Sequence, residues 1–231
     1  MKKTKSGYTL AEVLIVMIVI GVLAAILMPM FGNLRPNQEQ VMLKKAYYEA
    51  GRIVTELIND DELYAETDKD ETSGFANTAQ IKYKGKYYGT VANKKFCELF
   101  VDKINVKGAA SCQSYTLTSA MVKGQPATSK TFATADGMVW ILPISTFGGG
   151  SGTYQSMYVD VNGDKGPNCF SGFSSLAASV TCAKSQGPDR FEIQVNNLGK
   201  LKVPDRVSEI YLETNKTTKT YKDLIKGKLS Y

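Results

Sequence analysis

The chain opens with a short basic segment that runs directly into a long apolar one. Residues 1–7 contain three lysines, and the apolar segment then carries one charge, Glu12, with none from Val13 to Phe31. At about 1.5 Å of rise per residue, such a helix reaches across a hydrocarbon core of roughly 30 Å. The lysines on its amino side predict that the N-terminus is cytoplasmic and that the rest of the chain lies outside, after a single pass.

The apolar segment is expected to stay attached to the chain. A cleaved secretory signal ends in small residues, whereas this segment ends in Met28, Pro29, Met30 and Phe31. Glu12 needs a partner, because a carboxylate inside an apolar helix costs several kcal/mol unless it is paired or hydrated. On physical grounds alone, Glu12 is equally compatible with a charge at the membrane interface, where the positive end of the helix dipole favours it.

A helical pattern continues beyond the apolar segment. Apolar residues recur there mostly at steps of three and four, which predicts an amphipathic helix with one face against a sheet. They are Val41, Leu43, Ala46, Tyr47, Ala50, Ile53, Val54 and Leu57. We therefore expect one helix from about Thr9 to Asn59, with a bend near Pro36.

The rest of the chain, about residues 60–231, has the length of one domain and is patterned mainly as strands. Apolar runs flank turn residues at several points, which is typical of hairpins. The expected elements are a surface loop at 65–79, a hairpin at 80–90, a short helix within 94–106, a hairpin at 131–144 around Asp136-Gly137, and a hairpin at 190–203. The predicted fold class is α+β, with a long N-terminal helix packed on an antiparallel sheet.

Composition argues against an enzyme. The chain has no histidine, which excludes Ser-His and Cys-His nucleophiles, and it contains no phosphate-binding loop or dinucleotide fingerprint. The net charge is +6, to which Lys2, Lys3 and Lys5 contribute three. Further lysines gather from Lys200 to Lys228. Such a run usually forms a solvated face, so DNA binding is the less expected reading, although it is not excluded.

All four cysteines lie on the predicted exported side, where oxidation is the default. They are Cys97, Cys112, Cys169 and Cys182. Four cysteines allow three connectivities, and the sequence does not choose among them. We weakly prefer sequential pairing, because each bond would then fix one local loop. Zinc is a poor alternative, because the chain has no C-x-x-C spacing and no histidine.

The N-terminal residues resemble those of the type IV pilins and the type II secretion pseudopilins. The resemblance rests on the lysine-rich leader ending in Ser6-Gly7, the aromatic Tyr8, Glu12, the apolar run and Pro29. It implies that a membrane-embedded prepilin peptidase cuts between Gly7 and Tyr8 and methylates the new amine. Tyr8 departs slightly from the family, in which phenylalanine is commonest at this position.

The resemblance also implies roles for two residues of the helix. Glu12 would pair with the N-terminal amine of a neighbouring subunit as apolar helices pack into a fibre. Pro29 would let the helix loosen or extend within the fibre, although membrane helices also tolerate proline without such a role. The implied pilin-like organisation is a leader at 1–7, a membrane and assembly half of the helix at 8–31, an amphipathic half at 32–59, and a β-rich head at 60–231.

One segment of the head has the spacing of a calcium loop. Asp160, Asn162 and Asp164 alternate as oxygen donors, and Asp189 is a further candidate ligand. The match with an EF-hand is partial, because Lys165 replaces the glycine that follows the third donor and Ser171 replaces the closing glutamate. The alternative is a set of turns whose side chains bond their own backbone. Calcium is therefore a possible cofactor, and the sequence identifies no cofactor with certainty.

The expected function is structural: a pilin or minor pilin that is made as a bacterial inner-membrane precursor and becomes part of a periplasmic or extracellular fibre. Its expected partners are identical or related subunits, the prepilin peptidase and an inner-membrane assembly platform. A type II secretion pseudopilin is one alternative, and a membrane-anchored adhesin or binding protein is another. The leader does not separate these roles.

Overall fold

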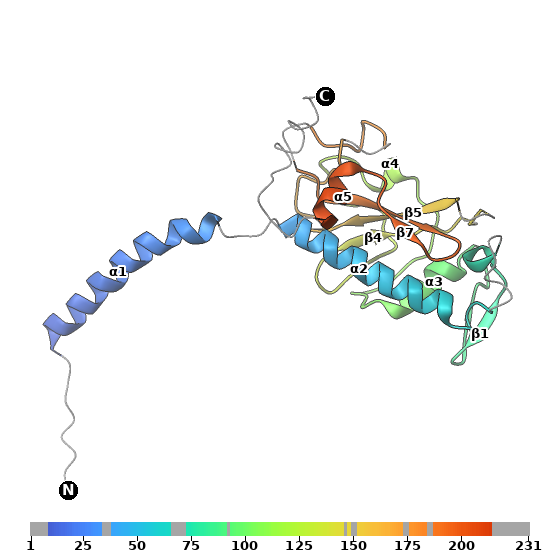
Figure 1. Cartoon of the computed structure of the whole chain (residues 1–231), viewed down its shortest axis with the longest axis horizontal. Helices are drawn as coiled ribbons and strands as arrows, with labels where there is room; N and C mark the ends of the chain where they lie inside the picture. The colour runs from blue at the N-terminus through green and yellow to red at the C-terminus, as the bar shows by residue number, and fades with distance from the viewer. Residues whose placement is uncertain are drawn as a thin grey trace, which may run out of the picture. The chain divides into compact units, whose positions relative to one another are not determined.

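The computed structural model describes residues 9–33, 38–65, 73–91, 93–145, 147–148, 152–172, 176–183 and 187–213, with residues 26–33 described by their backbone alone. The chain divides into two compact units. The first ends at Gln38 and contains helix α1, and the second begins at Glu39 and contains the sheets and the remaining helices (Figure 1).

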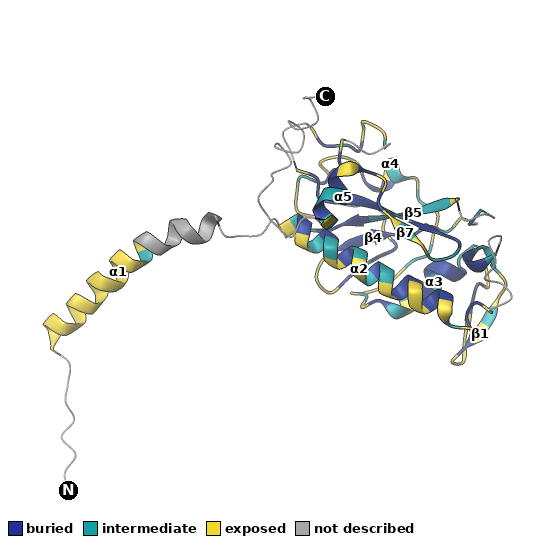
Figure 2. Ribbon diagram, in the orientation of Figure 1, coloured by how far each residue is buried: buried dark blue, intermediate teal, exposed yellow. Residues whose placement is uncertain are grey.

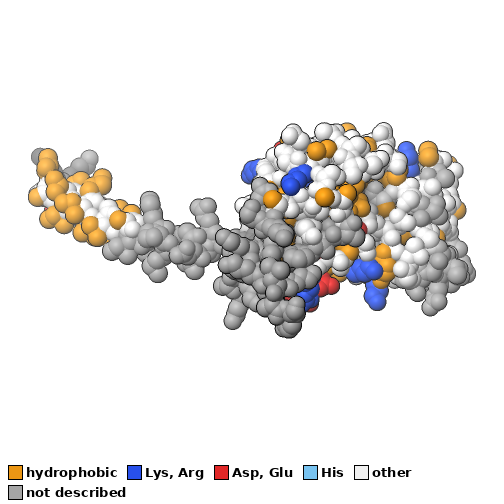
Figure 3. All heavy atoms as spheres, turned by 90° about the horizontal axis from the view of Figure 1, so that it is seen from above, with side chains coloured by type: hydrophobic (Ala, Val, Ile, Leu, Met, Phe, Trp, Pro, Cys, Tyr) orange, Lys and Arg blue, Asp and Glu red, His pale blue; other side chains and the backbone are white. Residues whose placement is uncertain are grey.

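Helix α1 spans Leu10–Asn33 and is helical through Pro29. Every side chain from Leu10 to Leu23 is exposed, and Glu12 is the one charge among them (Figure 2). Apolar side chains therefore cover the described part of the helix, which is predominantly orange in Figure 3. Within the described residues, no helix meets the combined length and hydropathy required to cross a membrane.

Helix α2, Gln38–Asn59, is amphipathic and ends at the residue that the sequence pattern predicts. Its buried face carries Leu43, Ala46, Ala50, Ile53, Val54 and Leu57, each fully buried. The opposite face is exposed, and the Tyr48 side chain keeps 68% of its surface. Residues 34–37, which include the predicted bend at Pro36, lie outside the described residues.

The main sheet has five antiparallel strands in the order β3-β4-β5-β6-β7. Consecutive strands are therefore neighbours throughout, as in a simple meander. The strands are β3 (Phe132–Ala133), β4 (Val139–Ile141), β5 (Tyr154–Asp160), β6 (Arg190–Asn196) and β7 (Leu201–Lys202). The longest pairing joins β5 to β6, from Tyr154 opposite Asn196 to Asp160 opposite Arg190. A separate two-stranded sheet pairs β1 (Ile81–Tyr83) with β2 (Lys86–Tyr88).

Because side chains alternate along a strand, apolar side chains lie on both faces of the sheet, although Arg190, Glu192 and Gln194 make the second face polar along β6. Trp140, Met157 and Phe191 share one core with α2 and with helix α3 (Lys95–Lys103). The opposite face, with Val139 and Ile141, packs in a second and smaller cluster. That cluster contains Ala120 of helix α4 (Leu117–Ala120), Met121, Phe170 and Val180. The head thus has a sheet between two layers.

The turns that the sequence predicts form hairpins. Asp136-Gly137 lies between β3 and β4, where Gly137 has a φ of 92°. Lys84-Gly85 joins β1 to β2, with φ values of 46° and 82°. Two consecutive positive φ angles match the type I′ turn, whose twist suits tight hairpins. The hairpin at 190–203 forms as β6 and β7, and α3 forms within 94–106.

The sequence pattern does not predict four elements: strand β5 and three helical segments. Strand β5 ends at Asp160, where the sequence analysis predicts a calcium loop, and no strand is predicted before it. Its alternation of Met157 and Val159 with polar neighbours is nevertheless typical of a strand. The others are η2 (Gly74–Ala76), α4 and helix α5 (Arg206–Glu213). Asp205 caps α5 through backbone N–H bonds from Val207 and Ser208, at 3.1 and 3.0 Å.

We predict that Ile53→Ala lowers the free energy of unfolding by about 2–5 kcal/mol, because the side chain is fully buried between α2 and the sheet. Tyr48→Ala, on the exposed face of the same helix, is the matched control and should change it by less than about 0.5 kcal/mol. Urea unfolding of the full chain in detergent measures both values. Equal losses for the two variants would contradict the observed orientation of α2.

Candidate functional site

The N-terminal end of α1 is closed by a reciprocal pair of side chains. The Thr9 backbone N–H and Oγ1 donate to Oε2 of Glu12, at 2.8 and 2.9 Å. The Glu12 backbone N–H in turn donates to Oγ1 of Thr9 at 3.3 Å. This is a capping box, in which a threonine before the helix and a glutamate three residues later satisfy each other's backbone donors. The Glu12 carboxylate therefore has a partner within its own chain.

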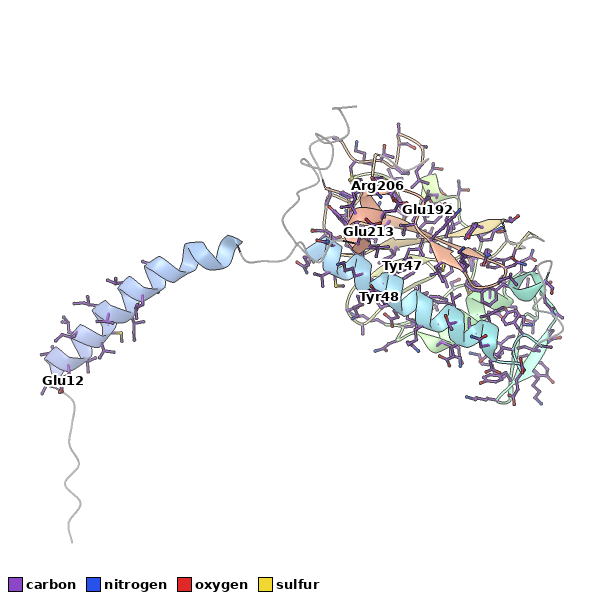
Figure 4. The ribbon with its side chains drawn as sticks, in the orientation of Figure 1. Glu12, Tyr47, Tyr48, Glu192, Arg206 and Glu213 are labelled. Carbon is purple, nitrogen blue, oxygen red and sulfur yellow. A yellow bond between two sulfur atoms is a disulfide. The ribbon has the colours of Figure 1, made fainter. Side chains whose placement is uncertain are left out.

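The capping box occupies one oxygen of the carboxylate. Among the described residues, Oε1 of Glu12 makes no hydrogen bond or ion pair, and Glu12 lies at the exposed end of α1 (Figure 4). Apolar side chains surround it, with Val13, Val16 and Met17 on the same face. One carboxylate oxygen is thus left exposed at the end of an apolar helix, where it can accept a further hydrogen bond.

The other predicted N-terminal residues lie partly outside the described chain. Gly7 and Tyr8, the predicted cut and methylation positions, are not among the described residues. Pro29 is described by its backbone, which is helical. The site that the structure shows is therefore Glu12 with Thr9.

Two disulfides close loops in the head. Cys97 of α3 bonds to Cys112, and Cys169 bonds to Cys182, with Cα atoms 5.9 and 5.0 Å apart. This is the sequential pairing. The first bond ties α3 to the segment that follows it. The second closes the segment that carries Phe170 and Val180, both of which belong to the second apolar cluster.

The predicted calcium residues fall at the ends of β5 and β6. Asp160 ends β5, and Asp189 precedes β6. The Val161 N–H donates to the Asp189 carbonyl at 2.9 Å, which holds the two segments together. Asn162 lies in the following loop and hydrogen-bonds Asp189 through its side chain. Asp164 is exposed to solvent. The structure therefore brings Asp160, Asn162 and Asp189 together and leaves Asp164 on the surface.

The two gathered carboxylates are already bound within the protein. Oδ2 of Asp160 accepts from Nε of Arg190 at 2.7 Å, and both side chains are fully buried. The Asp189 carboxylate accepts the backbone N–H groups of Asn168 and Cys169, at 2.7 and 2.8 Å. Burial raises the pKa of the Asp160 carboxyl to about 7 despite the opposing effect of Arg190, and burial also raises the pKa of Asp189.

The three gathered side chains by themselves carry fewer oxygens than a calcium ion takes. Calcium takes six to eight oxygen ligands. Two buried side-chain oxygens of the loop, Oδ1 of Asp160 and Oδ1 of Asn162, lack a hydrogen-bond partner. No group of three or more His, Cys, Asp or Glu side chains suited to a metal occurs within the described part of the chain.

Sequence reasoning missed two residues of these sites. Thr9 was not assigned a role, although a threonine three residues before a glutamate is the sequence signature of a capping box. Arg190 was not singled out either. No local sequence pattern identifies an arginine whose acceptors, a carboxylate and several backbone carbonyls, lie far away in the chain.

Comparison with protein families matches residues 2–28 to the prokaryotic N-terminal methylation motif. This motif is the prepilin-type signal of type IV pilins and pseudopilins, the substrates of prepilin peptidase. The matched range contains Thr9, Glu12 and the predicted cut between Gly7 and Tyr8. No curated protein and no solved structure matches the chain.

We predict that Cys169→Ser with Cys182→Ser lowers the free energy of unfolding by about 3 kcal/mol, because the bond closes a loop with a sequence separation of 13. Thermal unfolding with and without reductant measures the loss, and reductant should have a smaller effect on the variant than on the wild type. Non-reducing peptide mapping is the independent check. A peptide that links Cys97 to Cys169 would contradict the pairing.

Proposed function

We propose that the chain is a prepilin whose mature form is a structural subunit, a pilin or minor pilin, of a type IV pilus-like fibre. One observation carries the proposal: the described side chains of α1 are exposed and apolar on every side, and the one charge among them is Glu12 of the capping box. A helix that is apolar all round needs either lipid or other helices around it. The methylation motif at residues 2–28 identifies the same segment as a prepilin signal.

The precursor would be held in the bacterial inner membrane by α1. The uncharged run from Val13 to Phe31 supports a single pass, and the lysines of the leader support a head outside the cytoplasm. In this organisation residues 1–7 are the leader and 8–31 the membrane and assembly half of the helix. Residues 32–59 then form the amphipathic half, and 60–231 form the head.

Processing would leave the capping box intact. A cut between Gly7 and Tyr8 makes Tyr8 the first residue, and its amine would then be methylated. Thr9 and Glu12 both lie after the cut, so the three bonds between them need not change. The peptidase would create a cation one residue before the cap in the sequence.

Assembly would use the second oxygen of Glu12. We assign it to the N-terminal amine of a neighbouring subunit, which becomes available as the helices pack into the fibre. A subunit in the wrong axial position would leave both charges unpaired in apolar surroundings, at a cost of a few kcal/mol. The pair therefore sets the register, and the apolar surfaces supply most of the packing. Pro29 would permit local loosening of the packed helix.

A secretion pseudopilin would share this chemistry, because it differs in where the fibre ends and not in how its subunits pack. A membrane-anchored adhesin would instead use α1 as an anchor and would not depend on Glu12 for assembly. The location of the mature chain and its dependence on Glu12 distinguish these roles from a surface pilin.

We predict that the mature chain begins at methylated Tyr8. Mass spectrometry of the N-terminal peptide, from membrane and sheared extracellular fractions of the native cells, measures this directly. Recovery in the sheared fraction supports a surface fibre, and confinement to the envelope supports a pseudopilin. A chain that begins at Met1 in both fractions would overturn the prepilin proposal and leave a plain signal anchor.

We also predict that Glu12→Ala abolishes incorporation into fibres while the protein stays in the membrane. Thr9→Val should lower incorporation partially, because it removes the hydroxyl bonds to Glu12 but keeps the backbone N–H bond. Thr9→Ser, which restores the hydroxyl, is the matched control and should assemble normally. Immunoblots of sheared and membrane fractions measure all three variants. Normal assembly of Glu12→Ala would favour the anchored binding protein.

A further inference from the structure

Arg190, the first residue of β6, binds four oxygens from inside the head. Its side chain is fully buried. Nε donates to Oδ2 of Asp160 at 2.7 Å, and Nη2 donates to the Gln125 carbonyl at 2.7 Å. Nη1 donates to the carbonyls of Val122 and Asn168, at 3.1 and 3.2 Å. One guanidinium therefore joins the end of β5, the segment after α4 and the Asn168 backbone.

This set of acceptors has the chemistry of a hard-cation site. A carboxylate together with backbone carbonyls is the ligand type that calcium takes in proteins. Here the positive charge comes from the chain itself. The guanidinium is planar, permanently charged, and presents N–H groups in fixed directions, so it can satisfy several such oxygens at once.

Several other oxygens of the loop are also bound by protein donors, and Oδ1 of Asp160 and Oδ1 of Asn162 are the exceptions among the described buried side chains of the loop. Both oxygens of Asp189 accept backbone N–H groups. The Asn168 side-chain amide faces the carbonyls of Gly163 and Lys165, and it donates to both at 3.1 Å when its nitrogen is assigned to the position that faces them. A dication placed against the free oxygen of Asp160 would also face the guanidinium bound to the other oxygen, and the two like charges would repel.

We propose that the Arg190 guanidinium closes this loop in place of a metal ion, so that the Asp160–Asn168 segment keeps its structure without binding calcium. The spacing of Asp160, Asn162 and Asp164 is that of a calcium loop, but the charge that this loop requires is supplied from β6. The consequence is a head whose second layer is indifferent to the calcium concentration outside the cell.

The experiment compares thermal unfolding of the full chain in detergent with excess EGTA and with 1 mM calcium, at matched ionic strength. We expect the two melting temperatures to agree within about 1 °C. A loop with a Kd of roughly 10 μM would instead raise the melting temperature by roughly 5 to 10 °C. Asp164→Ala is the matched control, because this exposed carboxylate would be a ligand in a calcium loop but makes no part of the Arg190 network.

A calcium-induced rise that Asp164→Ala abolishes would overturn the proposal. A rise that Asp164→Ala retains but Asn162→Ala abolishes would overturn it as well, because the unpartnered oxygen of Asn162 would then be a ligand. A rise that both variants retain reports a site elsewhere in the chain and leaves this loop closed by arginine. Arg190→Gln provides the second test. It should lower the melting temperature by roughly 6 to 20 °C in EGTA, because it leaves the Asp160 carboxylate buried without its cation. An unchanged melting temperature for Arg190→Gln would also sink the proposal.

Discussion

The constraint on which the rest of the molecule depends is the apolar surface of α1. Its described side chains are exposed all round, and water would have to surround them in an isolated soluble protein. At about 25 cal/mol per Å² of apolar area, covering such a helix is worth far more than any single polar contact in the chain. In the proposed fibre, the polar chemistry at the end of α1 would therefore set direction and register, while burial of the helix would supply the driving force.

The head meets a different constraint, because buried apolar side chains lie on both faces of its sheet. Helix α2 and α3 cover one face, and the segments that follow α4 and β5 cover the other. The second layer has little regular structure of its own. Arg190 of β6 joins it to the sheet, and the Cys169–Cys182 bond closes its second segment on itself. Long-range bonds thus replace the backbone ladder that a helix or strand would provide.

Local signals in the sequence predicted several elements correctly. Asp136-Gly137 requires no tertiary information to form a turn, and the spacing from Leu43 to Leu57 places the buried face of α2. Strand β5 was missed because Asp160, Asn162 and Asp164 were given more weight than the alternation of Met157 and Val159. Arg190 could not have been assigned a role from sequence. Its acceptors at Val122 and Gln125 are backbone groups, and their approach depends on the folded sheet.

In the proposed fibre, the capping box would affect the rate at which subunits join. Free glutamate side chains sample many rotamers, and fixing one on docking costs roughly 0.5 to 1.5 kcal/mol. Thr9 holds the Glu12 carboxylate through two bonds within the isolated subunit, so most of that entropy is already lost before an encounter. A preorganised acceptor lets a larger fraction of collisions become productive. Chain growth would then depend on how quickly helices meet, with little delay for the charged groups to find one another.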